Sequence, residues 1–177
     1  PGGTNRPKIV GYQQGIWEPW IRKEDNSFNY MTNGVVDPEW MTAGECNHYW
    51  YRIGNQVTVN SYATWKKADT SETSSNIFWE GLPYLIAAKQ EGKAYRPFTG
   101  SLYYYNIKDV TPGTVLVPYY WNGSGGGSDN RIRFRFVGSL TNLKSSQVNT
   151  SFYMTWTTTY LTDDTDWQPL NGATVDS

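Results

Sequence analysis

YWYRIGNQVTVNSYATW, residues 49–65, contains two alternating runs separated by a glycine-asparagine pair. From Val57 to Trp65, apolar or small side chains occupy every second position and polar ones lie between them. Alternation with a period of two is typical of a strand with one buried face. Gly54 and Asn55 tolerate the backbone angles of a tight two-residue turn. The stretch therefore predicts a β-hairpin, from which we expect Trp50 and Tyr62 to meet solvent or a neighbouring subunit.

The composition of the whole chain favours the same structural class. Its 177 residues include 9 Trp, 14 Tyr, 6 Phe and 17 Gly. Strands favour aromatic residues, and turns favour glycine, asparagine, serine and proline. Residues 22–47 are polar, and we interpret them as loop-like. We predict eight or nine short strands in an all-β, antiparallel, jelly-roll-like β-sandwich, with the clearest strands at 76–80, 101–107, 115–121, 131–137 and 151–162.

Residues 131–137, RIRFRFV, alternate between apolar and basic side chains. We expect the arginine row at positions 131, 133 and 135 to be a solvated outer face. A subunit interface or a site for an anionic glycan is the alternative. The same alternation predicts the core, which we expect to include Val57, Val59, Ile132, Phe134, Phe136, Phe152, Met154 and Trp156.

The charge balance and the apolar runs exclude two classes of partner. The formal net charge is −1, from 15 Lys and Arg against 16 Asp and Glu. Nucleic-acid binding needs a strongly basic face, so we expect no nucleic-acid partner. No apolar run approaches the roughly 20 residues that span a bilayer, so we expect no membrane insertion.

The residues that usually carry catalysis or hold metals are sparse. Cys46 is the only cysteine and His48 the only histidine, whereas zinc usually takes three or four such ligands. A Cys-His nucleophile pair is the sharper alternative to a half-buried thiol, which we favour. Paired carboxylates could hydrolyse a glycoside, but the spacing pairs none of them. The acidic residues at 163–166 could bind calcium, although a solvated tail is the favoured interpretation. We predict no enzyme activity, no catalytic residue, no metal and no cofactor.

Aromatic rings next to turns are the best candidates for ligand contact, because rigid aromatic side chains lose little entropy on binding. One group precedes the glycine-rich segment 122–130, and another ring lies in the polar segment after residue 22. Three consecutive tyrosines at 103–105 require at least one ring to face away from the core. The candidate ligand-binding residues are Trp40, Tyr104, Tyr119, Tyr120 and Trp121.

Four motifs in a fixed order resemble the C-terminal head domains of bacteriophage tail fibres. They are GIWEP at 15–19, HYWYRIGNQVTV at 48–59, NIFWEGLPY at 76–84 and TTTYL at 157–161. The resemblance implies a β-sandwich that forms a homotrimer on a fibrous shaft and contacts the host cell surface. The chain departs from the family pattern between Trp20 and Cys46 and in the glycine-rich segment, so no binding residue of the family is transferred to either region.

Our working hypothesis is therefore a non-enzymatic phage fibre head, located on the virion, that binds a host surface glycan or protein. It assigns residues 1–14 to a leader or shaft connection, 15–162 to the head domain and 163–177 to an acidic, mobile tail. The alternatives are a carbohydrate-binding module or lectin of a larger enzyme, and a structural virion decoration protein.

Overall fold

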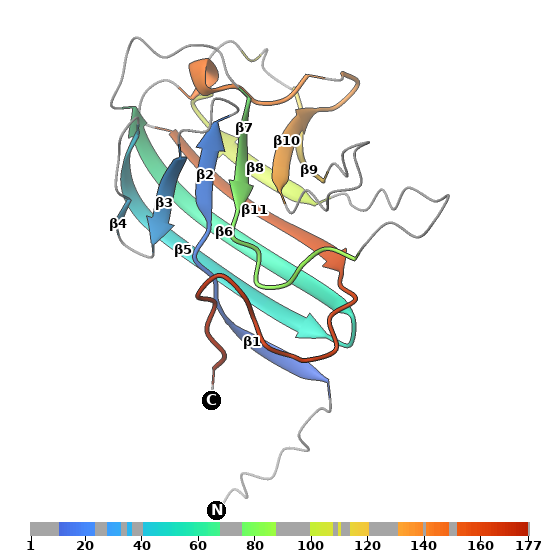
Figure 1. The fold of residues 1–177 in the computed structure, drawn as a ribbon. Coiled ribbons are helices and arrows are strands. Elements are labelled where there is room, and N and C mark those ends of the chain that lie inside the picture. Colours follow the sequence, from blue (N-terminus) through green and yellow to red (C-terminus); the bar gives the residue numbers. More distant parts are fainter. Residues whose placement is uncertain are drawn as a thin grey trace, which may run out of the picture.

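The computed structural model consists of two antiparallel β-sheets packed face to face (Figure 1). The five-stranded sheet has the order β1 (Tyr12–Ile16), β5 (Met41–Ile53), β6 (Gln56–Lys67), β11 (Phe152–Leu161) and β8 (Ser101–Tyr105). The six-stranded sheet has the order β4 (Val35–Val36), β3 (Phe28–Thr32), β2 (Trp20–Lys23), β7 (Ile77–Glu80), β10 (Ile132–Phe136) and β9 (Leu116–Tyr120). This arrangement confirms the predicted all-β antiparallel sandwich. The structure describes residues 11–23, 28–32, 35–36, 41–67, 76–87, 100–107, 110, 114–120, 131–139, 141–148 and 152–176.

The predicted hairpin is formed by β5 and β6. Ile53 pairs with Gln56 across the turn, and Gly54 has a φ of 57°, the positive value that II′ hairpin turns place on a glycine. Both strands are longer than the sequence pattern indicated, because a register shift between Ala43 and Cys46 interrupts the alternation in β5. The hairpin is therefore confirmed, and its strands extend beyond the stretch that predicted it.

The polar segment 22–47 is not the loop that we expected. It contains β3, β4 and the first part of β5, and β2 ends inside it. β3 pairs with β2, and β2 pairs with β7, so the backbone hydrogen bonds of these strands are satisfied within the six-stranded sheet. These strands form because their backbones pair with neighbouring strands. The sequence of the segment shows no apolar alternation from which they could have been predicted.

The core lies between the two sheets and is built from interlocking rings. Trp79 and Phe134 pack edge to face with centroids 4.7 Å apart, and Phe134 packs in the same way on Trp156 at 5.3 Å. Such edge-to-face pairs stabilise a core by about 0.5–1.5 kcal/mol beyond the burial of their area. Among the predicted core residues, Phe136 is half-buried and the side chain of Phe152 lies outside the described residues. The others are buried as predicted: Val57, Val59, Ile132, Phe134, Met154 and Trp156.

Trp50 faces this core and not solvent. The two-residue turn pairs Trp50 with Val59, so both side chains lie on the inner face of the five-stranded sheet. Trp50 is 1% exposed, and its indole Nε1 donates a hydrogen bond to the Thr174 carbonyl oxygen at 3.1 Å. The expectation that Trp50 meets solvent was wrong, whereas Tyr62 does point outward and is half-buried.

The five-stranded sheet is longer than the sheet that faces it. The six-stranded sheet covers only one part of β5, β6 and β11, and the segment after β7 together with the segment after β11 crosses the remaining part (Figure 1). Two backbone hydrogen bonds join these segments to each other and to β11, from Leu170 N to the Pro83 oxygen and from Ala87 N to the Leu161 oxygen. The conformation of both segments is thus part of the sandwich.

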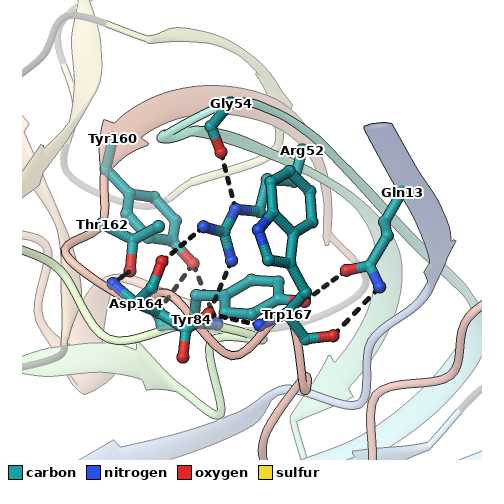
Figure 2. Close-up of polar contacts among 8 residues, drawn as sticks. All are labelled: Gln13, Arg52, Gly54, Tyr84, Tyr160, Thr162, Asp164 and Trp167. Atoms are coloured by element: carbon teal, nitrogen blue, oxygen red, sulfur yellow. Dashed lines mark hydrogen bonds and ion pairs between the residues drawn. The ribbon is translucent and has the colours of Figure 1, made fainter. Parts of the chain in front are cut away.

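The acidic segment after β11, expected to be a mobile tail, is anchored through residue 176. The Arg52 guanidinium donates hydrogen bonds to the Asp164 carboxylate at 2.7 Å and to the Asp164 carbonyl at 2.6 Å (Figure 2). It lies 3.8 Å from the centre of the Trp167 ring and 4.5 Å from that of Tyr84. A buried cation on the sheet therefore holds a segment whose acidic composition suggested a solvated chain.

Arg133 in the row on β10 is buried, whereas we expected a solvated face. It is 8% exposed, and its guanidinium lies over the Phe78 ring at 5.5 Å. Arg131 lies over the same ring at 4.3 Å and pairs with Glu80 at 2.8 Å. The aliphatic stems and planar heads of these arginines cover apolar surface. Arg131 and Arg133 therefore cover the Phe78 ring on the outer face of the six-stranded sheet.

The edges of the sheets account for two further features. Pro118 lies in the edge strand β9, as a residue without a backbone donor should. On the opposite sheet, the amides of Thr174 and Asp176 donate to the carbonyls of Ile16 and Gln14, both at 2.8 Å, and cover the free edge of β1.

Within the described residues, no helix is long and apolar enough to cross a membrane.

Candidate binding face

The outer face of the five-stranded sheet is rich in tyrosine. Alternation along β5 directs Trp50 and Arg52 inward, so Tyr49 and Tyr51 point away from the core. The same rule directs Tyr104 inward on β8. Every tyrosine that is exposed among the described residues lies on this outer face: Tyr12, Tyr49, Tyr51, Tyr103 and Tyr105.

Register brings side chains from four strands into two neighbouring rows across this face. One row consists of Asn47, Tyr62, Thr155 and Tyr103, which are successive pairing partners from β5 to β8. The next row consists of Tyr49, Asn60, Thr157 and Ser101. The two rows line an open groove of about 430 Å³. Both sides of the groove are thus fixed by backbone pairing in a sheet.

Four tyrosine rings gather at one end of the groove. Tyr153, on β11, lies with its centroid 5.6 Å from Tyr103, 5.7 Å from Tyr105 and 6.5 Å from Tyr62. The Tyr105 and Tyr153 rings are nearly parallel, at 19°. A hydrogen bond with Tyr103 raises the pKa of Tyr153, so this phenol is neutral at physiological pH. We call Tyr62, Tyr103, Tyr105 and Tyr153 the tyrosine cluster.

The groove presents uncharged groups to solvent. Among the described residues that line it, the polar side chains are amides, aliphatic hydroxyls and phenols, and none carries a charge. Such groups can donate and accept hydrogen bonds, while the rings offer flat apolar surface. The arrangement suits the recognition of a ligand with hydroxyl groups and an apolar face.

His48 and Cys46 lie on the inner face of β5, away from the groove. Both are buried, and His48 Nδ1 is 2.9 Å from the Ser61 hydroxyl oxygen. Burial lowers the pKa of His48 to about 3 and raises that of Cys46 to about 11. At neutral pH the imidazole is uncharged and the thiol is protonated, which favours a structural role over an activated nucleophile. No cluster of three metal-ligand side chains occurs in the described part of the chain.

The structure separates the ring residues that the sequence selected. Tyr104 is half-buried and donates a hydrogen bond to the Thr114 carbonyl at 2.7 Å. Tyr119 is in the other sheet, with the Arg135 guanidinium 4.0 Å from its ring centre. Tyr120 is the last residue of β9, where its backbone pairs with Ile132 of β10, and its side chain lies outside the described residues. Trp40 and Trp121 also lie outside them. Neither Tyr104 nor Tyr119 lines the groove.

Sequence reasoning selected Tyr104 and passed over its neighbours. The prediction that at least one of the three consecutive tyrosines faces outward is confirmed, because Tyr103 is 59% exposed and Tyr105 is 60% exposed. Tyr49 precedes Trp50, so alternation along the strand puts the two side chains on opposite faces. The signal that could have found the groove was the turn of the hairpin, because it assigns Tyr49 and Tyr62 to one outward face.

Comparisons with known proteins find a similarity in fold and none in sequence. No protein-family model matches the chain, and no curated protein matches its sequence. Among solved structures, it is similar to the crystal structure of the Dettilon tailspike protein, with a TM-score of 0.50 and 13% identity over 83% of this chain. The chain spans 23% of the length of that protein. At this identity the similarity shows a shared fold.

Proposed function

We propose that this chain is a non-catalytic attachment domain of a bacteriophage tail, binding a glycan or protein on the host cell surface. The observation that carries the proposal is the open groove on the five-stranded sheet, with its exposed rings and uncharged hydrogen-bonding groups. The fold that the chain shares with the Dettilon tailspike protein and the four fibre-head motifs in its sequence support the phage assignment.

Binding by this groove needs little rearrangement. Most of its side chains project from β5, β6 and β11, which are paired on both sides, and tyrosine has only two side-chain torsions to fix. A site that is held in shape before the ligand arrives loses less free energy to ordering. This rigidity favours attachment by a preformed face.

The chemistry of the groove favours binding over turnover. General acid-base catalysis needs a group that can exchange a proton near neutral pH, such as imidazole or carboxylate. Among the described residues that line the groove, the titratable side chains are tyrosines. We therefore propose retention of the ligand without hydrolysis.

We also propose that the domain acts on the outside of the virion as a homotrimer. An apolar area on β1 and β5, next to the groove, supports contact between copies: Ile16, Tyr51 and Ile53 are exposed and lie on neighbouring strands. Adjacent exposed apolar side chains favour burial against another protein surface.

The attachment role is tested by the binding of fluorescently labelled chain to a panel of bacterial strains in flow cytometry. We expect the unmodified chain to label at least one strain, and Tyr49→Ala combined with Tyr103→Ala to abolish that labelling. Tyr12→Ala is the matched control, because Tyr12 is exposed on the same face but does not line the groove. Equal labelling by the double variant and the unmodified chain would contradict the proposed site.

A further inference from the structure

The groove lies on strands that carry few charges. β1, β8 and β11 contain no charged residue. In β5, Arg52 points into the core and is paired with Asp164. The other charged residues of β5 and β6, which are Glu45, Lys66 and Lys67, are not among the described residues that line the groove. By contrast, the outer face of the six-stranded sheet carries Arg131, Arg133 and Glu80. The chain has 31 residues in the classes Lys+Arg and Asp+Glu, 15 and 16 respectively, so its composition does not explain the difference.

The polar side chains of the groove are available to a ligand. Within the described part of the chain, the amides of Asn47 and Asn60 and the hydroxyl of Thr155 make no side-chain hydrogen bond. They alternate with the rings of Tyr49 and Tyr62 along and across the strands. Amides and hydroxyls between rings match the mixed surface of a sugar, which has polar edges and an apolar C–H face.

An anionic ligand would lack compensation in this groove. Carboxylate, phosphate and sulfate lose hydration on binding, and proteins usually repay this with arginine, lysine or a helix N-terminus. Among the described residues, the lining contains none of the three. A neutral polyhydroxylated ligand loses less hydration and can use every polar group that the groove offers.

The size of the groove fits a short ligand segment. Small-molecule sites usually have volumes of about 300–1,000 Å³. The groove, at about 430 Å³, is open along the sheet and does not enclose its contents. An open groove can hold an internal segment of a longer chain.

We infer that the ligand of this groove is a neutral saccharide segment, without carboxylate, phosphate or sulfate groups, stacked on Tyr49, Tyr62 and Tyr103. This inference rests on the proposed attachment function and narrows it to one class of receptor. The ring faces supply the apolar contact, and the amides of Asn47 and Asn60 bind the hydroxyl groups.

The test is binding of the full chain to an immobilised panel of neutral oligosaccharides and of their uronic, sialylated and phosphorylated counterparts. We expect retention on neutral members only, with a Kd that changes less than about twofold between 50 and 500 mM salt, because no ion pair is screened. Tyr49→Ala and Tyr103→Ala should each weaken binding about tenfold, and Tyr12→Ala should leave it unchanged. Preference for acidic members, or strong salt dependence, would overturn the inference.

Treatment of the labelled bacteria separates failure of this inference from failure of the attachment role. Periodate cleaves the vicinal diols of sugars, so it should abolish groove-dependent labelling, and protease should not. Labelling that needs Tyr49 and Tyr103 but survives periodate would overturn the saccharide inference and leave attachment intact. Labelling that does not depend on these rings would overturn the groove as the attachment site and the saccharide inference with it. Absence of labelling on every strain would overturn the attachment role.

Discussion

Arg52 shows how a charge can be accommodated in the core of this sandwich. Its side chain is 2% exposed, and its guanidinium donates to the Gly54 carbonyl as well as to Asp164. The Trp167 and Tyr84 rings lie within 3.8 and 4.5 Å of it. A buried guanidinium with satisfied donors and stacked rings is tolerated, whereas one without partners is not.

Removing the acidic partner should therefore be more harmful than removing the cation. Asp164→Ala leaves a guanidinium buried without its counter-ion, and we expect a loss of about 3 kcal/mol in the free energy of unfolding. Arg52→Met leaves a carboxylate that is 26% exposed and can be hydrated, so its cost should be smaller. Urea unfolding measures both.

Asp166→Ala provides the matched control, because Asp166 is a neighbouring, exposed acid. Its unfolding midpoint should equal that of the unmodified chain. An equal loss for Asp164→Ala and Asp166→Ala would show that general acidity, and not the Arg52 contact, stabilises the segment.

The same carboxylate should make stability depend on pH. Burial by itself would raise the pKa of Asp164, but hydrogen bonds from Arg52 and the Trp167 amide, with the Arg52 charge, lower it below its usual value. The unfolded chain therefore binds a proton more readily than the folded one. The stabilisation is present above about pH 4 and is lost as the pH falls through the lowered pKa.

Thermal unfolding between pH 6 and pH 2.5 measures this contribution. We expect the melting temperature of the unmodified chain to fall more steeply below about pH 4 than that of Asp164→Asn, which has no proton to gain there. Parallel curves for the two proteins would contradict the lowered pKa.

At the scale of elements, the β5–β6 turn depends on one glycine. Gly54 has a φ of 57°, and a Cβ added there would meet no atom within 4 Å. Gly54→Ala should therefore lose only the conformational preference, about 1 kcal/mol. Asn55→Ala, at the turn residue without a positive φ, should cost less in the same thermal melts. Equal costs would show that the turn does not need its glycine.

Gly15 has a different role, which is to admit the C-terminal segment. A Cβ on Gly15 would lie 1.8 Å from the Thr174 carbonyl oxygen, so Gly15→Ala must displace the segment from β1. We expect a loss of about 1–3 kcal/mol and faster hydrogen exchange at the amides of Thr174 and Asp176. Gly54→Ala should leave the exchange at these two amides unchanged, and unchanged exchange in Gly15→Ala would contradict the packing.

Local patterns in the sequence predicted the individual strands and the hairpin better than they predicted the order of the strands in the sheets. The turn predicted the hairpin, and the same turn pairs Trp50 with Val59, so the burial of Trp50 could have been predicted too. The sheet order could not, because β11 and β8 reach β6 through long-range pairing that leaves no mark in either strand. The groove depends on that order, and so do the partners of Tyr62 and Tyr103.

At the scale of the molecule, the sandwich class could be predicted from the sequence. The segments that cover the five-stranded sheet where the six-stranded sheet does not reach could not. The segment after β11 is acidic and lacks alternation, so nothing local indicated that Asp164 and Trp167 would close over Arg52. The signal that existed was an arginine on the inward side of a strand. A buried arginine requires a partner from elsewhere in the chain.

Assembly is the prediction that belongs to this scale. If Ile53 and Tyr51 contact another copy, light scattering of the full chain should give three chain masses, and Ile53→Arg should shift the protein towards the monomer. Leu85→Arg, at an exposed apolar position away from these strands in sequence, serves as control. A monomer at all concentrations would contradict the proposed trimer.

β1 has hydrogen-bonded backbone on both of its edges, with β5 on one side and the amides of Thr174 and Asp176 on the other. A mechanical pull on the chain ahead of Tyr12, resisted by a receptor held on β5 and β6, would load these bonds along the strand direction. Bonds loaded in shear must break together, whereas bonds at a peeled edge break one by one. The C-terminal segment therefore adds a second row of hydrogen bonds to the row between β1 and β5, and both rows share the load. Because Gly15→Ala displaces this segment, tethered force spectroscopy of the variant should record rupture at lower force.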